Sequence, residues 1–135
     1  MLKTVKNIRK LYNAKLLFVS SDEKINQVIG NEFDDYFKEL KVVSDLKDAL
    51  ALACSNNYDI TIIDADIVGV SFSELCNELS QLAPTLPKIV ISDADNNENI
   101  VTAINSGAYT FLSKPLRAKD LKLAVIMCLN QTKRG

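Results

Sequence analysis

The stretch Ile60-Thr61-Ile62-Ile63-Asp64 decides the fold of this chain. A near-continuous apolar run of this length is typical of a strand that is covered on both faces, and such strands belong to parallel sheets. Asp64 ends the run, so the sequence predicts a carboxylate at the carboxyl edge of a parallel sheet.

Two further apolar runs end in polar residues in the same way. Lys88-Ile89-Val90-Ile91 runs into Ser92, and Tyr109-Thr110-Phe111-Leu112-Ser113 runs into Lys114-Pro115. If all three runs are parallel strands, Asp64, Ser92 and Lys114 converge on one edge of one sheet. A carboxylate, a hydroxyl and an ammonium are groups that phosphoryl transfer uses.

Composition places the chain among folded proteins of ordinary kind. The 135 residues suffice for one domain, and 47% hydrophobic with 24% charged residues excludes a disordered chain. The net charge of -1 and the lack of a dense Lys/Arg stripe predict no direct nucleic acid binding by this domain. No apolar stretch reaches the roughly 18 residues of a membrane span, and the N-terminus lacks a signal-peptide core, so we expect no membrane contact and a cytoplasmic location.

The absence of histidine narrows the chemistry. Without an imidazole the chain cannot use Ser-His or Cys-His nucleophilic catalysis or build most zinc sites. Cys54, Cys76 and Cys128 are odd in number, widely spaced and set in helical patterns, so we expect three buried free thiols.

Strands and helices are expected to alternate along the chain. Ser71 and Glu74 have the spacing of a helix capping box, Pro84 and Pro87 end that helix, and Gly107 is a typical helix stop. The expected strands are 15–19, 42–43, 58–63, 88–91 and 109–112. The expected helices are about 23–39, from 45 to the Asn pair at 56–57, from 71 to before 84, 96–106, and from about 118.

Strict alternation with short links predicts right-handed crossovers and a three-layer, doubly wound α/β fold with a five-stranded parallel sheet. Ligands of such sheets bind outside the carboxyl ends of the strands, where the strand order reverses. We expect one domain over residues 15–130. Residues 1–14 precede it as a basic, amphipathic helical arm, and residues 131–135 follow as a polar tail or the start of a linker.

Over roughly residues 15–130 the chain resembles the receiver domain of bacterial two-component response regulators. The resemblance implies a flavodoxin-like sheet of order 2-1-3-4-5 and an aspartate, Asp64, that accepts a phosphoryl group from a partner histidine kinase or phosphotransfer protein. It rests on the Asp64 strand end, Gly69 five residues later, Ser92, the Asn-Ser-Gly-Ala of 105–108, Phe111 and Lys114-Pro115.

The resemblance also implies residue roles. Asp64 is the nucleophile, Ser92 the switch hydroxyl, Lys114 the phosphate clamp and Phe111 the aromatic switch residue. The chain is then a signalling domain and not an enzyme, apart from self-catalysed phosphotransfer and dephosphorylation. Its output surface comprises the fourth helix, fifth strand and fifth helix of the domain, expected at 96–106, 109–112 and from about 118. A partner or a second copy in a homodimer recognises this surface.

The chain departs from the family where the metal binds. The family has two adjacent acids after the first strand that help to hold Mg²⁺, whereas here Ser20 and Ser21 follow Val19. Neutral hydroxyls are poor ligands for Mg²⁺. Asp22 and Asp66 are the side chains that could join Asp64 in holding the metal; alternatively, Asp22 caps a helix and Asp66 lies on a surface loop.

Two other functions stay open from the sequence. The serine pair, together with Asp93 in place of a small residue, favours a pseudo-receiver that binds protein partners or dimerises without phosphorylation. In the family the position of Asp93 borders the path to the phosphoryl group, so in the switch alternative we expect phosphorylation kinetics that are slow in both directions. The topology is also that of flavodoxin-like cofactor domains. The loop at Ser20–Lys24, however, lacks the glycine with which backbone wraps a phosphate.

Overall fold

A computed structural model describes residues 13–33 and 37–132. Of the expected N-terminal helical arm over residues 1–14, residues 1–12 lie outside the described residues, as do residues 133–135 of the tail. Within the described part, five parallel strands form one sheet of order β2-β1-β3-β4-β5. The predicted α/β class and strand order are therefore confirmed. The strands are β1 (Lys15–Val19), β2 (Glu39–Val43), β3 (Ile60–Asp64), β4 (Lys88–Asp93) and β5 (Thr110–Lys114).

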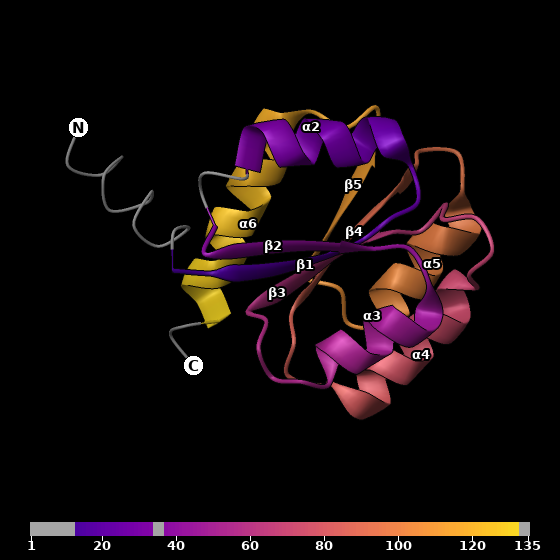
Figure 1. Ribbon diagram of the computed structural model, residues 1–135. Helices are drawn as coiled ribbons and strands as arrows, with labels where there is room; N and C mark the ends of the chain where they lie inside the picture. Colours follow the sequence, from indigo (N-terminus) through magenta and orange to yellow (C-terminus); the bar gives the residue numbers. More distant parts are fainter. Residues whose placement is uncertain (1–12, 34–36, 133–135) are drawn as a thin grey trace.

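Helices cover both faces of the sheet, which gives the three layers that the sequence predicts (Figure 1). Helices α2 and α6 lie on one face, and α3, α4 and α5 lie on the other. Among the described helices, none is long and apolar enough to span a bilayer. The helices are α2 (Glu23–Phe33), α3 (Leu46–Ala53), α4 (Phe72–Leu82), α5 (Asn97–Asn105) and α6 (Ala118–Thr132).

The strand β3 is buried along its whole length, and its side chains alternate between two hydrophobic clusters. Ile60 and Ile62 belong to the cluster under α2 and α6, whereas Ile63 belongs to the cluster under α3, α4 and α5. Thr61 satisfies its buried hydroxyl by donating to the Leu17 carbonyl at 2.9 Å. Burial on both faces explains the unbroken apolar run, because neither face of β3 meets water.

Side-chain caps begin several helices where the sequence predicts. The Ser71 hydroxyl accepts from the Glu74 N–H at 3.2 Å at the start of α4. Asp45 caps α3 through the Asp48 N–H at 2.7 Å, and Asn96 caps α5 through the Asn99 N–H at 3.1 Å. Such caps pair backbone donors that have no partner within the helix.

The expected helix over 23–39 and strand over 42–43 are wrong in their bounds. The described part of α2 is Glu23–Phe33, residues 37 and 38 are not helical, and β2 already begins at Glu39. The sheet determines this boundary: the Lys38 N–H donates to the Ala14 carbonyl at 2.9 Å, and Glu39 pairs with Lys15. Helical spacing was misleading here because Phe37 packs into the same cluster as Phe33, although it lies beyond α2.

The cysteine prediction needs one correction. Cys76 and Cys128 are buried free thiols, as expected, but Cys54 is exposed. Cys54 is the C-cap of α3, where the chain leaves the helix toward the loop that leads to β3. Its backbone position at the helix end, rather than its apolar character, determines its exposure.

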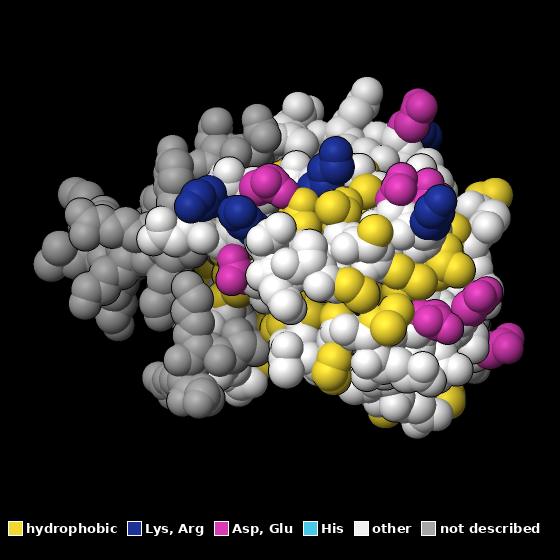
Figure 2. All heavy atoms as spheres, turned by 60° about the horizontal axis from the view of Figure 1, so that its bottom comes forward, with side chains coloured by type: hydrophobic (Ala, Val, Ile, Leu, Met, Phe, Trp, Pro, Cys, Tyr) yellow, Lys and Arg dark blue, Asp and Glu magenta, His cyan; other side chains and the backbone are white. Residues whose placement is uncertain are grey.

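The layer of α3, α4 and α5 also exposes apolar side chains. Leu82 of α4 and Val101 and Ile104 of α5 are each more than half exposed. A view that brings this layer forward shows hydrophobic side chains gathered across it, with acidic side chains at its border (Figure 2).

Candidate functional site

Asp64 occupies the position that the sequence predicts, at the carboxyl end of β3. Its side chain is almost completely buried. One carboxylate oxygen, Oδ1, lies 3.0 Å from Lys114 Nζ and accepts the Asp66 N–H at 3.0 Å. The other oxygen, Oδ2, accepts the Ser20 hydroxyl at 3.4 Å. The buried charge of Asp64 is thus balanced by one ammonium and two neutral donors.

The Asp66 carboxylate forms several contacts at the site that the sequence does not predict. Its Oδ2 lies 3.1 Å from Lys114 Nζ and accepts the Asp93 N–H at 2.9 Å. Its Oδ1 accepts the Ser92 hydroxyl at 3.1 Å and the Asn99 side-chain amide at 3.3 Å. The Asn99 amide also donates to the Ser92 hydroxyl at 3.2 Å. Asp66 therefore connects β4, α5 and β5 beside Asp64.

Lys114 ends β5 and holds both carboxylates with one ammonium. Partial burial alone would lower the pKa of Lys114, but its hydrogen bonds and charge interactions with Asp64 and Asp66 outweigh burial and raise it. Burial would likewise raise the pKa of Asp66, yet hydrogen bonds from Lys114, the Asp93 N–H and Ser92 lower it. Both partners are therefore charged around neutral pH. The Lys114-Pro115 peptide bond is cis.

The first strand brings Ser20, but not Asp22, to the acceptor. The Ser20 hydroxyl accepts the Asp22 N–H at 3.1 Å while it donates to Asp64. Ser21 lies further out and accepts the Val68 N–H at 3.3 Å. Asp22 directs one carboxylate oxygen to the Lys24 and Ile25 N–H groups, at 3.0 and 3.4 Å, and so caps α2. Its carboxylate supports a helix start.

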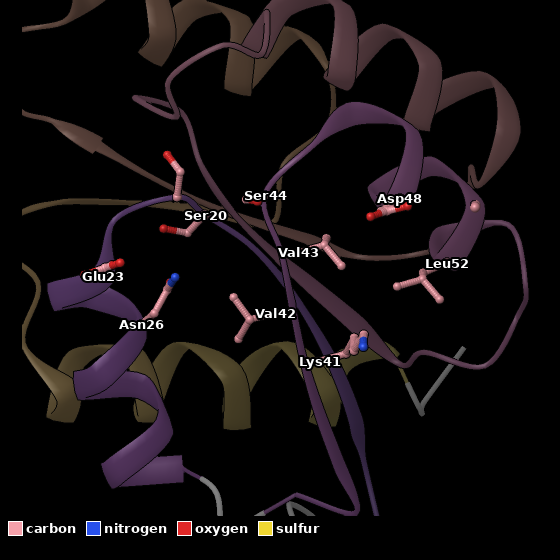
Figure 3. A pocket seen from close by; sticks show the side chains of 11 residues that line it. Ser20, Glu23, Asn26, Lys41, Val42, Val43, Ser44, Asp48 and Leu52 are labelled. Carbon is pink, nitrogen blue, oxygen red and sulfur yellow. The ribbon is translucent and has the colours of Figure 1, made fainter.

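A pocket of about 620 Å³ opens next to the acceptor, between the start of α2, the edge strand β2 and α3 (Figure 3). Ser20, Glu23 and Asn26 line one wall, and Lys41, Val42 and Leu52 line the other. Ser20 belongs to both places, because it lines this pocket and also contacts Asp64. The Ser20 hydroxyl thus lies between the buried Asp64 carboxylate and this pocket.

The side chains at this edge of the sheet are not arranged to bind Mg²⁺. Magnesium requires several hard oxygens in octahedral array, with one or two carboxylates among them. Asp22 caps a helix, Asp66 is engaged by four donors, and Ser20 and Ser21 are neutral. Within the described residues, no three acidic, Cys or His side chains gather where they could hold a metal ion.

The structure brings together four of the residues singled out from the sequence: Asp64, Asp66, Ser92 and Lys114. Phe111 lies on β5, half-buried against the cluster under α3, α4 and α5. Sequence reasoning did not identify Asn99 or the Asp93 N–H as members of the site. An Asn at the third residue of a helix that follows Ser92 is a weak signal, and a backbone N–H carries none.

Fold and site together define a flavodoxin-like α/β domain with an aspartate, a hydroxyl and a lysine at the carboxyl edge of the sheet, beside the point between β1 and β3 where the strand order reverses. The family model of the response regulator receiver domain matches residues 16–126. The chain belongs to this family of signalling domains. Receiver domains generally bind Mg²⁺ in an acidic pocket, which here contains serines where the family has its acid pair.

Named relatives agree with this assignment. The response regulator ArlR of Staphylococcus saprophyticus is 25% identical over 107 residues, which cover 79% of this chain and 48% of the relative. The chain thus spans about half the length of such curated relatives.

Solved structures give the same result. The signal receiver domain of an HD domain-containing protein from Pseudomonas fluorescens has a TM-score of 0.82 at 26% identity, over 91% of each chain. The receiver domain of the Francisella response regulator 1452 has a TM-score of 0.77 at 30% identity, over 89% of this chain and 99% of that one. A CheY-like receiver domain from Methanospirillum hungatei, at 20% identity and a TM-score of 0.81, supports the fold alone.

Proposed function

We propose that this domain accepts a phosphoryl group on Asp64 from a partner histidine kinase or phosphotransfer protein. The observation that carries the proposal is the contact of the buried Asp64 carboxylate with Lys114 Nζ at 3.0 Å, at the carboxyl end of β3 in a chain of the receiver-domain family. Lys114 is the group that would stabilise negative charge on the incoming phosphoryl oxygens.

The transfer balances as a single displacement. An oxygen of Asp64 attacks phosphorus in line, so that an O–P bond forms as the P–N bond of a phosphohistidine breaks. The histidine nitrogen leaves with the bonding electron pair and takes up a proton when it returns to neutral imidazole. Lys114 and the Ser92 hydroxyl act as positioned donors to the phosphoryl oxygens, and neither changes its protonation state.

The output surface in this proposal is the face of α5, β5 and α6. Leu123 and Met127 of α6 are about half exposed, and they line a groove of about 490 Å³ against β5. Val101 and Ile104 of α5 are also more than half exposed. A phosphoryl group on Asp64 would form hydrogen bonds with Ser92 and Lys114. It would thereby shift the ends of β4 and β5, which support this face.

Phosphorylation by a small-molecule donor tests the acceptor. Intact mass spectrometry after incubation with phosphoramidate should show one added phosphoryl group, and Asp64→Asn should abolish it. Asp59→Asn is the matched control, because Asp59 is an exposed aspartate at the opposite end of β3, next to Ile60. Label that persists in Asp64→Asn, or wild-type protein that never takes label, would overturn the proposal.

A second function, a phosphorylation-independent interaction module, is favoured by one observation. The donors Ser92 and Lys114 already hold the Asp66 carboxylate in the unmodified chain. In that case partner binding would be the same for wild type and Asp64→Asn. Pull-down or calorimetry with an identified partner separates the two functions.

A further inference from the structure

The carboxylate of Asp66 sits in a cradle of four donors. These are one ammonium, one hydroxyl, one backbone N–H and one side-chain amide, at 2.9–3.3 Å. They come from three elements: the end of β4, the first turn of α5 and the end of β5. Such a convergence of donors of mixed type on two oxygens is an anion-binding site, and its present occupant is a side chain of the same protein.

The same cradle is the place that a phosphoryl group on Asp64 would require. Lys114 Nζ contacts Asp64 Oδ1 at 3.0 Å and Asp66 Oδ2 at 3.1 Å, so the Asp66 carboxylate lies directly beside the acceptor. Ser92, the hydroxyl expected to bind a phosphoryl oxygen, gives its hydrogen bond to Asp66 instead. One ammonium faces two carboxylates, so a third anion would meet net negative charge.

We propose that Asp66 is an internal anion that occupies the phosphoryl position and competes with any phosphoryl group or oxyanion for Lys114, Ser92 and the Asp93 N–H. That this position would bind the phosphoryl group rests on the proposed function. That the Asp66 carboxylate fills it rests on the distances alone. Asp66 is a positioning residue here. It holds the Ser92 hydroxyl and the start of α5 at the sheet edge in the unmodified chain.

The hydrogen-bond network shows why Asp66 is held firmly. Asn99 donates from one amide group to both Asp66 and Ser92, and its own N–H is bonded to the cap residue Asn96. Displacing the carboxylate would therefore break contacts on β4, α5 and β5 together. A phosphodonor has to supply equivalent contacts before transfer becomes favourable, which predicts slow labelling of the wild-type chain.

Anion binding tests the proposal without requiring phosphorylation. Inorganic phosphate is titrated into ¹⁵N-labelled wild type, Asp66→Ala and Asp66→Asn, and the Asp93 amide is followed by NMR. Asp66→Ala should bind phosphate about ten- to a hundredfold more tightly than wild type, the range that one contact to a charged group supplies. Asp66→Asn should show a smaller gain, because its amide oxygen still fills part of the cradle.

Asp95→Ala is the matched control. Asp95 is exposed on the same loop after β4, so its removal changes the net charge equally and leaves the cradle intact. An equal gain in phosphate affinity for Asp95→Ala and Asp66→Ala would reduce the effect to general charge and overturn the proposal. Dispersed spectra show that each variant is folded, and Asp66→Asn, close in size and shape to Asp66, carries the test should Asp66→Ala unfold.

A second readout separates this inference from the proposed function. The rate of labelling by phosphoramidate should rise at least about tenfold in Asp66→Ala and remain at the wild-type value in Asp95→Ala. If no variant takes label but Asp66→Ala binds phosphate tightly, the inference stands and the acceptor proposal fails. If Asp64 takes label at equal rates in all variants and phosphate affinity is unchanged, the inference fails and the acceptor proposal stands.

Discussion

Replacing Lys114 with Met should destabilise the domain strongly near neutral pH and weakly in acid. Lys114 is the ammonium between Asp64, which is 2% exposed, and Asp66, which is 20% exposed. Its loss leaves a buried carboxylate without a cation and two like charges side by side. Breaking a buried ion pair in this way costs about 3–5 kcal/mol.

The expected magnitude lies at the low end of that range. Lys114 and Asp66 are each about one-fifth exposed, so water screens part of the interaction, and we expect about 3 kcal/mol. For a domain of this size that corresponds to a decrease in Tm of roughly 10 °C. The pairs share one ammonium, so Lys114→Met combined with Asp66→Asn should recover about half of the loss.

Urea unfolding at pH 7 and pH 4.5, followed by circular dichroism, measures this cost. The Lys114→Met penalty should shrink at pH 4.5, because without the ammonium the pKa of Asp66 is no longer lowered, so its carboxylate takes up a proton more readily and the repulsion is relieved. Lys119→Met, an exposed lysine at the start of α6, is the control and should change stability by less than about 0.5 kcal/mol. A Lys114→Met penalty below about 1 kcal/mol, or one equal at both pH values, would refute this electrostatic account.

Three further outcomes follow from the structure. Calorimetric titration with Mg²⁺ should show at least about tenfold tighter binding to the Ser20→Asp/Ser21→Asp variant than to wild type, since two carboxylates restore the ligands that magnesium prefers; equal affinities would contradict the role given to the serines. Leu75→Ala, at a fully buried position of α4, should cost about 3 kcal/mol in urea unfolding, and a cost below about 1 kcal/mol would show that α4 packs loosely. Burial raises the pKa of the Cys128 thiol to about 11. Above about pH 8.5 the unfolded chain therefore loses this proton before the folded chain does, and the free energy of unfolding falls by up to about 1.4 kcal/mol per pH unit. Cys128→Ala should flatten this decline between pH 8.5 and 10, and an unchanged slope would exclude this thiol as its source.

Much of the site could be predicted because strand ends are local features. The apolar runs before Asp64, Ser92 and Lys114 end where the strands emerge from the core, and parallel strands place such ends at one edge. The bounds of α2 and β2 were harder to predict from the sequence. Phe37 and Leu40 pack against the same cluster as Phe33, so burial alone could not distinguish a longer helix from a strand.

The sequence alone thus determined the α/β class, the order of elements and the three residues expected to carry phosphoryl chemistry, because hydrophobic period and strand ends are written in neighbouring residues. Only the tertiary structure decided where the Asp66 carboxylate lies. Its donors at Ser92, Asp93, Asn99 and Lys114 are 26 to 48 residues away in the chain and include a backbone N–H. Their convergence depends on the packing of three loops at one sheet edge, and no local pattern encodes that geometry.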